Sequence, residues 1–318
     1  MTQLGYTLSS EEHGPMELVE NARRAEAAGF DFVSISDHFH PWISAQGESP
    51  FVWSTLGAIA AATDEIDVGV GVTCPTMRIH PLNVAHAVAT VDEMLDDRFT
   101  FGVGTGENLN EHVVGHRWPE HDVRLEMLEE AMAVMRSLWT GETISHRGEY
   151  YTVENARLYT VPDDQPTTIA SAFGPRTAEW AAEYGDGIWC SGPQTEIVDI
   201  YEDAGGEGPR YTQVHCCYAE TEAEAIDTVL KYWPNGSLPG ELAQELPTPA
   251  HFEQAASMVD REDVGASGTI TDPDPTAHVE GIQEAIDAGY DHVYVHQIGP
   301  DQAELLEFYE EDVLPSFE

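Results

Sequence analysis

The chain has 318 residues, 42% of them hydrophobic, which is enough to bury a substantial core in one large domain or two smaller ones. Its 58 acidic residues outnumber 13 lysines and arginines, so the net charge of −45 argues against nucleic acid or an anionic membrane as a partner. A run of about eighteen apolar residues, which a membrane span requires, is absent, and the N-terminus lacks the pattern of a signal peptide.

The acidic residues are spread along the whole chain rather than gathered in a tail. This distribution favours a halophilic protein, because multimolar salt shortens the Debye length to ~3 Å or less and weakens self-repulsion. The four cysteines fit no zinc spacing and no disulfide framework, which favours a cytoplasmic protein.

Strand-like and helix-like segments alternate along the chain. Helices are expected at 15–30, 49–63, 81–95, 123–141 and 301–314, and strands at 4–10, 30–37, 66–75, 99–107, 167–174, 187–192, 211–219 and 292–299. One junction recurs in "AEAAGFDFVSIS", "AAEYGDGIWCS" and "AIDAGYDHVYVHQ", where a helix is followed by a glycine, an aspartate and a short strand. The glycine suits a left-handed helix cap.

Eight strands alternating with helices predict a (β/α)8 TIM barrel as a single domain over 1–318. A doubly wound open sheet is the alternative, but no early G-x-G-x-x-G follows the first strand. Two segments interrupt the alternation: about 142–165 is expected as a hairpin, and 232–265 as an insertion that covers the substrate pocket.

Catalytic groups of such barrels lie at the carboxyl ends of the strands. Four strand ends carry polar residues that a core would not select: "SDHFHPW", "GVGVTCPTM", "GVGTGENLNE" and "IWCSGP". His38 and His40 would point to the same side of a strand and could hold a metal. Such a centre also needs further histidines and an acid from later strands and often a bridging lysine, and the lone Lys231 lies at no strand end. Glu107 follows small residues that allow close approach of a ligand, and it could act as a general acid or base.

Together these motifs resemble the luciferase-like barrel superfamily, in the branch that uses the deazaflavin coenzyme F420. The matching segments are "SDHFHPW", "TCPTMRIHP", "GVGTGENLNE", "RGEYYTV" and "GDGIWCSG", and the likeness covers almost the whole chain. Within that branch the chain resembles the F420-dependent glucose-6-phosphate dehydrogenases and the F420-dependent secondary alcohol dehydrogenases.

The resemblance implies a role for each matching residue. His38 and Trp42 would lie beside the reacting carbon, with His38 as base or alkoxide stabiliser and Glu107 as acid at the cofactor. Gly71–Val72 would form a non-proline cis peptide behind the ring, and Ser191 would contact the substrate. The other expected cofactor contacts are Asp37, Cys74, Thr105, Gly106 and Asn110 at the ring, and Phe173, Gly174, Arg176 and Thr177 at the tail phosphate, where a helix N-terminus offers free N–H groups.

The chemistry of the residues agrees with this expectation. Removing a hydride from an alcohol carbon also requires loss of the hydroxyl proton, which a histidine can accept near neutrality. Asp37 or another carboxylate could raise the basicity of His38.

The chain departs from the pattern of the glucose-6-phosphate dehydrogenases in the residues expected to bind the substrate. The segments "CSGPQTEIV", "HFEQAASMV" and "GASGTITDP" contain no lysine or arginine, so a dianionic sugar phosphate would be poorly held. A neutral alcohol, a free sugar or another hydroxylated metabolite is therefore expected. The alternatives are an FMN-dependent monooxygenase of the same superfamily, a metal-dependent hydrolase built on His38 and His40, and a non-catalytic flavin-binding relative. The family resemblance also implies a homodimer formed through barrel helices.

Overall fold

The computed structural model describes residues 2–317, and within them eight parallel strands close into a barrel in the order β1-β10-β9-β8-β7-β4-β3-β2. The expected TIM barrel is confirmed, and the open sheet is excluded because β1 pairs with both β2 and β10. The strands are β1 Gln3–Leu8, β2 Phe32–Ile35, β3 Asp67–Thr73, β4 Phe99–Val103, β7 Thr168–Ser171, β8 Gly187–Ser191, β9 Arg210–Cys216 and β10 His292–Gln297.

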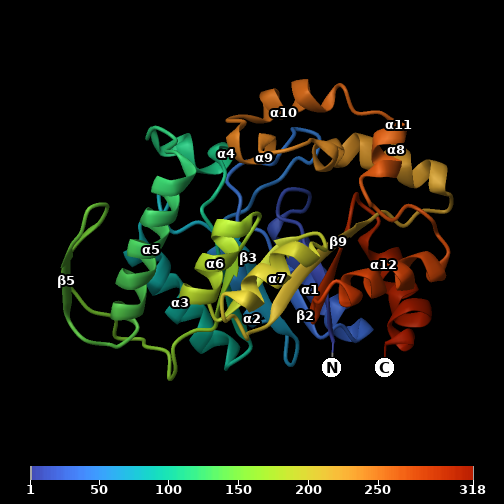
Figure 1. Ribbon diagram of the computed structural model, residues 1–318. Coiled ribbons are helices and arrows are strands. Elements are labelled where there is room, and N and C mark those ends of the chain that lie inside the picture. Colours follow the sequence, from blue (N-terminus) through green and yellow to red (C-terminus); the bar gives the residue numbers. More distant parts are fainter. Residues whose placement is uncertain (1, 318) are drawn as a thin grey trace.

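Helices surround the barrel and carry the connections between strands (Figure 1). They are α1 Pro15–Ala28, α2 Val52–Ala60, α3 Pro81–Leu95, α4 Asn108–Glu111, α5 His121–Leu138, α6 Pro175–Tyr184, α7 Thr195–Asp203, α8 Glu222–Tyr232, α9 Leu242–Glu245, α10 Pro249–Ala256, α11 Arg261–Ala266, α12 Pro275–Asp287 and α13 Gln302–Phe308. Most of the apolar core lies between these helices and the barrel, so the sheet is covered on its outer face.

The recurrent helix–glycine–aspartate junction fastens adjacent strands together. Each of its aspartates precedes a strand, and its carboxylate accepts a backbone N–H near the start of the neighbouring strand. The three bonds are Leu4 N to Asp31 Oδ2 at 2.7 Å, Thr168 N to Asp186 Oδ2 at 2.8 Å and Arg210 N to Asp291 Oδ1 at 2.9 Å. The junction therefore helps to fix the register at the amino-terminal end of the barrel.

The glycines of the junction differ from one another. Gly29 and Gly289 are left-handed, with φ of 90° and 102°, as expected of helix caps. The expectation is wrong for Gly185, which has φ −97° and ψ 166°. Its role is spatial, because a Cβ there would lie 2.9 Å from the carbonyl oxygen of Ala181.

Two segments depart from the barrel. The antiparallel hairpin of β5 (Ile144–Arg147) and β6 (Thr152–Ala156) projects beside α5, and helices α8–α11 lie across the carboxyl-terminal end of the barrel (Figure 1). The second segment is anchored to the barrel by an apolar cluster around Ile43, Leu109 and Phe252.

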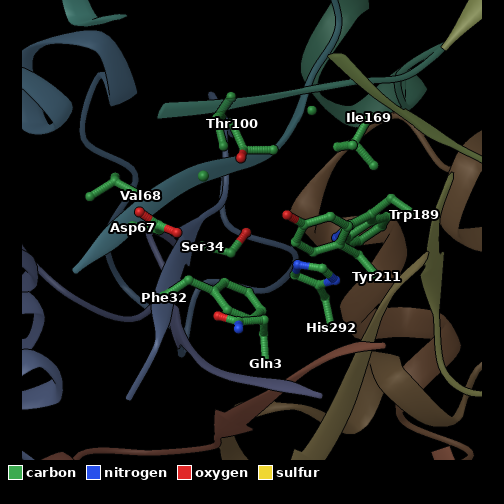
Figure 2. Close-up of a pocket in the computed structure, with 13 residues that line it drawn as sticks. Gln3, Phe32, Ser34, Asp67, Val68, Thr100, Ile169, Trp189, Tyr211 and His292 are labelled. Carbon is green, nitrogen blue, oxygen red and sulfur yellow. The ribbon is translucent and has the colours of Figure 1, made fainter. Parts of the chain in front are cut away.

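The opposite end of the barrel interior is nearly filled. A cavity of about 30 Å³ remains there, and Figure 2 shows Phe32, Tyr211, Trp189 and His292 around it. This volume accommodates only about one or two water molecules. A larger ligand must therefore bind at the carboxyl-terminal end, beneath α8–α11.

Candidate active site

A cavity of about 740 Å³ lies at the carboxyl-terminal end of the barrel, in the size range of small-molecule sites. Residues from both the strand ends and the covering segment line it. Of the site residues expected from the sequence, the structure places the following on its wall: His38, Trp42, Gly71, Val72, Thr105, Gly106, Glu107, Phe173, Gly174, Arg176, Thr177 and Ser191.

Three expected cofactor contacts lie behind the wall instead. Asp37, Cys74 and Asn110 are buried and do not line the cavity. Asp37 and Asn110 link neighbouring wall segments through their side chains, whereas the Cys74 thiol contacts Thr76 of its own segment.

The partner of His38 is Glu11, a residue that follows β1. His38 Nε2 lies 3.3 Å from Glu11 Oε1, and His38 Nδ1 lies 3.1 Å from the carbonyl oxygen of His40. Glu11 Oε2 accepts a hydrogen bond from the Ser36 hydroxyl at 2.6 Å. Burial raises the pKa of Glu11, but His38 and the Ser36 hydroxyl outweigh it and lower that pKa below its ordinary value. Glu11 therefore favours its ionised form beside the His38 ring.

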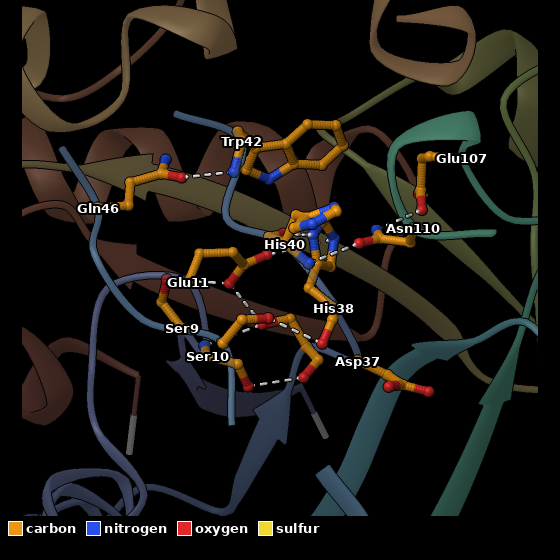
Figure 3. Close-up of polar contacts among 12 residues, drawn as sticks. Ser9, Ser10, Glu11, Asp37, His38, His40, Trp42, Gln46, Glu107 and Asn110 are labelled. Carbon is orange, nitrogen blue, oxygen red and sulfur yellow. Dashed lines mark hydrogen bonds and ion pairs between the residues drawn. The ribbon is translucent and has the colours of Figure 1, made fainter. Parts of the chain in front are cut away.

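Asp37 was the first carboxylate expected to support His38, and the structure corrects this. Figure 3 shows the Asp37 carboxylate directed away from the His38 ring, while Glu11 lies beside it. Asp37 accepts a hydrogen bond from the Thr73 hydroxyl at 2.8 Å and pairs with Arg78 at 2.8 Å. It therefore ties the end of β2 to the end of β3.

Arg78 is the centre of a buried ion triad. Its guanidinium pairs with Asp37 on one side, and its Nε lies 3.5 Å from Glu111 Oε1 on the other, while its backbone N–H donates to Glu111 Oε2 at 2.7 Å. Burial raises the pKa of Glu111 to about 7, although the nearby Arg78 opposes the rise. The triad joins three wall-forming loops, those after β2, β3 and β4.

Asn110 links the histidine-bearing loop to the candidate acid. Its side-chain oxygen accepts the backbone N–H groups of Phe39 at 2.9 Å and His40 at 3.2 Å, and its amide nitrogen donates to Glu107 Oε2 at 3.3 Å. Figure 3 shows Asn110 between the His40 loop and Glu107. Because of this link, the positions of His38 and Glu107 across the cavity depend on each other.

Between the ends of β3 and β4, the backbone itself forms part of the cavity wall. Gly106 has φ 76°, and a Cβ there would lie 2.6 Å from Cys74 Sγ. The peptide between Gly71 and Val72 is cis, as the family resemblance implies. Cys74 Sγ lies 3.0 Å from the Thr76 hydroxyl, and burial raises the pKa of its thiol, so it is a packing residue in its protonated form.

The expected anion site lies at the start of α6. The Thr177 hydroxyl accepts the N–H groups of Phe173 at 3.2 Å and Gly174 at 3.3 Å, which orders the turn. The Arg176 guanidinium forms an ion pair with Asp122 of α5. Both side chains are more than half exposed, so this pair is weak and the guanidinium is available to an anion.

His38 and His40 do not face one site. Strand β2 ends at Ile35, so the alternation expected of a strand does not apply to them. His40 Nδ1 lies 3.2 Å from the carbonyl oxygen of Leu109, whereas His38 faces Glu11. Among residues 2–317, no three or more His, Cys, Asp or Glu side chains gather in a way that could hold a metal ion.

Sequence reasoning missed Glu11, Arg78 and Glu111. Glu11 follows the strand ending at Leu8 in "SSEEHG", so the same rule that selected the other strand ends also applied there. Arg78 and Glu111 lie inside the family motifs "TCPTMRIHP" and "GVGTGENLNE", but no spacing in the sequence indicates that their side chains meet.

Comparison with known proteins agrees with this architecture. Residues 1–292 match the sequence model of the luciferase-like monooxygenase family. The chain belongs to this family. Of the described residues, none forms a helix long and apolar enough to cross a membrane.

Several relatives in the family cover nearly the whole chain. The F420-dependent glucose-6-phosphate dehydrogenase of Intrasporangium calvum is 36% identical over 331 residues, covering 99% of this chain and 98% of the relative. The F420-dependent glucose-6-phosphate dehydrogenase 2 of Rhodococcus jostii is 36% identical over 333 residues, with the same coverage of 99% and 98%.

A solved family structure has the same fold over its full length. An F420-dependent secondary alcohol dehydrogenase in complex with an F420-acetone adduct superposes with a TM-score of 0.92 at 29% identity, covering 100% of this chain and 99% of the other. The F420-dependent tetrahydromethanopterin reductase of Methanopyrus kandleri, at 20% identity and a TM-score of 0.79 over 100% of this chain and 99% of the other, supports the fold alone.

Proposed function

We propose that this protein is an F420-dependent oxidoreductase that transfers a hydride between the CH–OH group of an uncharged small molecule and the deazaflavin. The observation that carries the proposal is one cavity whose wall brings together the His38–Glu11 pair, Trp42 and Glu107. The relatives named above, which are F420-dependent dehydrogenases of a sugar phosphate or a secondary alcohol, support it.

The residues of the cavity fit such a cofactor. Gly71, Val72, Thr105 and Gly106 would hold the ring, because the glycines at these strand ends let a planar group approach the backbone. The first turn of α6, with Arg176 and Thr177, would hold the anionic tail through N–H groups and a guanidinium. Behind the ring site, the Asp37–Arg78–Glu111 triad would keep the wall rigid.

When bound, the deazaflavin supplies a two-electron hydride acceptor. In neutral His38, Nδ1–H donates to the carbonyl oxygen of His40, so Nε2 is the atom that accepts the hydroxyl proton of the substrate as the hydride leaves. The new Nε2–H of the imidazolium then donates to Glu11 Oε1. Trp42, whose ring centroid lies 4.8 Å from that of His38, confines the reacting carbon and excludes water from the base. Glu107, held by Asn110, exchanges a proton at the cofactor side of the cavity.

The charges around the cavity favour an uncharged substrate. Glu11, Glu107 and Glu241 line it, and Arg176 is the only lysine or arginine on its wall within the described chain. A sugar phosphate bound away from α6 would meet carboxylates and no cation, which disfavours a dianion. The segment 232–265 would act as the cover of the substrate end, through Trp233, Leu238 and Phe252.

The proposal also includes adaptation to salt, the cellular location and the oligomeric state. A halophilic, cytoplasmic enzyme with no affinity for nucleic acid suits the net charge of −45. A homodimer would form through barrel helices, where Phe51 at the start of α2 and Met94 on α3 are exposed. Light scattering in multimolar KCl tests the dimer, and a monomer at all protein concentrations contradicts it.

The first experiment is a fluorescence titration of the protein in multimolar KCl with F420 and, separately, with FMN. Saturable F420 binding with weak FMN binding is expected, followed by reduction of F420 in the presence of isopropanol or glucose and weaker turnover of glucose-6-phosphate. Tight FMN binding without F420 binding would instead support the monooxygenase alternative and remove the roles of His38 and Glu107.

A further inference from the structure

A second carboxylate–histidine array lines the cavity, apart from the Glu11–His38 pair. His296 of β10 places Nε2 2.8 Å from Glu12 Oε2 and Nδ1 3.0 Å from His215 Nδ1 of β9. Glu12 is fixed in turn, because its Oε1 accepts the backbone N–H of Gly299 at 2.9 Å. His296 and Glu12 are almost completely buried, so the array is a built element and not a surface contact.

The free end of this array faces the cavity. His215 lines the wall, and its Nε2 has no hydrogen-bond partner among the described residues, yet it is not sealed away from solvent. Removal from water, together with the neighbouring His296, lowers the pKa of His215 to about 3. His215 is therefore a neutral group at any pH near neutrality.

The hydrogen-bond directions follow from this geometry. With His296 neutral, its Nε2–H donates to Glu12, so its Nδ1 accepts from His215 Nδ1–H and His215 Nε2 presents a lone pair to the cavity. With His296 protonated, both of its nitrogens donate, and His215 Nε2 presents an N–H instead. A hydroxyl group matches both states, because it can donate and accept, whereas a carbonyl or a phosphate oxygen matches only the second.

The neighbours of His215 have the same character. Five uncharged hydrogen-bonding side chains line the cavity on β8, β9 and the segments that directly follow β8 and α8: Ser191, Gln194, Gln213, Trp233 and Asn235. Glu241 is the charged residue that the covering segment contributes to the wall. Ser191 and Gln213 belong to β8 and β9, Gln194 directly precedes α7, and Trp233 and Asn235 follow α8, so none of them belongs to the first turn of α6. Uncharged donors and acceptors in such number suit several hydroxyl groups better than one apolar alcohol.

We propose that the Glu12–His296–His215 array recognises a second hydroxyl group of the substrate, so that the substrate class is an uncharged polyhydroxylated molecule such as a polyol or free sugar. This inference rests on the proposed function for the identity of the reaction. His215 is a specificity-determining residue, and Glu12 and His296 are positioning residues that act through it.

The test compares substrates that differ in hydroxyl number, isopropanol, propylene glycol and glucose, in the wild type and in His215→Phe, which keeps a planar ring but removes both nitrogens. We expect His215→Phe to lower kcat/KM for glucose by ~10–100-fold, mainly through KM, because a buried hydrogen-bonding site discriminates strongly against loss of its partner. Turnover of isopropanol and the F420 dissociation constant should change less than about twofold. His215→Asn, which retains a donor and an acceptor, should recover part of the loss, and Glu12→Gln should produce an intermediate loss.

An equal loss on isopropanol and glucose, or no loss on either, would overturn the inference. Calorimetric binding of glucose to the cofactor-free protein provides a second measurement, in which His215→Phe should weaken binding by a similar factor. A protein that binds glucose through His215 but does not bind F420 would refute the proposed function alone. Reduction of F420 with isopropanol, together with equal kcat/KM for glucose in the wild type and His215→Phe, would refute this inference alone.

Discussion

Glu11 Oε1 lies 3.3 Å from His38 Nε2, although the two residues are 27 positions apart in the chain and follow different strands. Glu11 is held by the Ser36 hydroxyl at 2.6 Å, so its orientation is fixed by the segment after β2 that also carries His38. In the proposed mechanism the carboxylate would stabilise the imidazolium that forms when His38 accepts a proton. The pair is the centre of the proposed hydride-transfer chemistry.

Glu11→Gln should therefore reduce turnover without loss of cofactor binding. The amide has no charge to stabilise the imidazolium, so we expect kcat to fall by ~10²-fold or more, within the range for general base catalysis. The F420 dissociation constant, measured by fluorescence, should stay within about twofold. Glu20→Gln, an exposed change on α1, is the matched control and should leave both values unchanged. Normal kcat in Glu11→Gln would exclude the pair from the mechanism.

Arg78→Met should destabilise the fold. It leaves the buried Asp37 and Glu111 carboxylates without their cation, so we expect the free energy of unfolding to fall by ~3–5 kcal/mol. Arg23→Met, at a side chain that is 57% exposed, should change it by less than about 1 kcal/mol. Denaturant unfolding in KCl measures both. The double change Arg78→Met with Glu111→Gln should recover part of the stability, and a loss equal to that of Arg78→Met alone would contradict the role of Glu111 in the triad.

The buried Glu111 predicts a specific pH dependence. Its pKa is raised to about 7 in the folded protein, above ~4.3 for an unperturbed glutamate, so between these values the folded state binds the extra proton. Its contribution to stability is therefore present at low pH and is lost as pH rises through this window. Glu111→Gln, which cannot titrate, should lose less stability than the wild type between about pH 5 and pH 8. Parallel pH profiles of the melting temperature would refute the shift.

Gly106 and Gly115 are a matched pair for testing whether the backbone beside the proposed cofactor site tolerates a side chain. Both have positive φ, 76° and 86°, but a Cβ at Gly106 would lie 2.6 Å from Cys74 Sγ, whereas nothing lies within 4 Å at Gly115. Gly115→Ala should cost about 1 kcal/mol from backbone strain alone. Gly106→Ala should cost more and also weaken F420 binding. Adding Cys74→Ala should relieve only part of the excess, because the new Cβ would still lie 2.9 Å from Glu111 Cγ. Equal losses in the two single variants would show that the contact with Cys74 is unimportant.

The net charge of −45 predicts strong salt dependence. Because the Debye length falls from about 10 Å at 0.1 M to about 3 Å at 1 M, repulsion among the surface acids should weaken steeply over this range. We expect the melting temperature to rise continuously as KCl increases up to the multimolar range. A melting temperature that does not depend on KCl would contradict the proposed adaptation to salt.

Much of the fold was predictable from local pattern. The eight strand positions and the helix 81–95 agree with the structure because hydrophobic period, proline starts and glycine ends are encoded locally. Gly185 shows the limit of such reasoning. Its place in the repeated junction suggested a left-handed cap, yet the close approach of the Ala181 carbonyl oxygen requires glycine there in an extended conformation.

The sequence by itself determined the barrel and which strand ends carry reactive side chains, since a residue's place at the end of a strand is a local property. It selected His38, Trp42 and Glu107, which line the same cavity in the structure. Only the tertiary structure decided which charged side chains pair with each other. Asp37 is adjacent to His38 in sequence but faces Arg78, while Glu11 reaches His38 from β1. Barrel closure brings distant strand ends within hydrogen-bond distance, and side chains at adjacent positions diverge, so partnership between charges is a property of the closed fold.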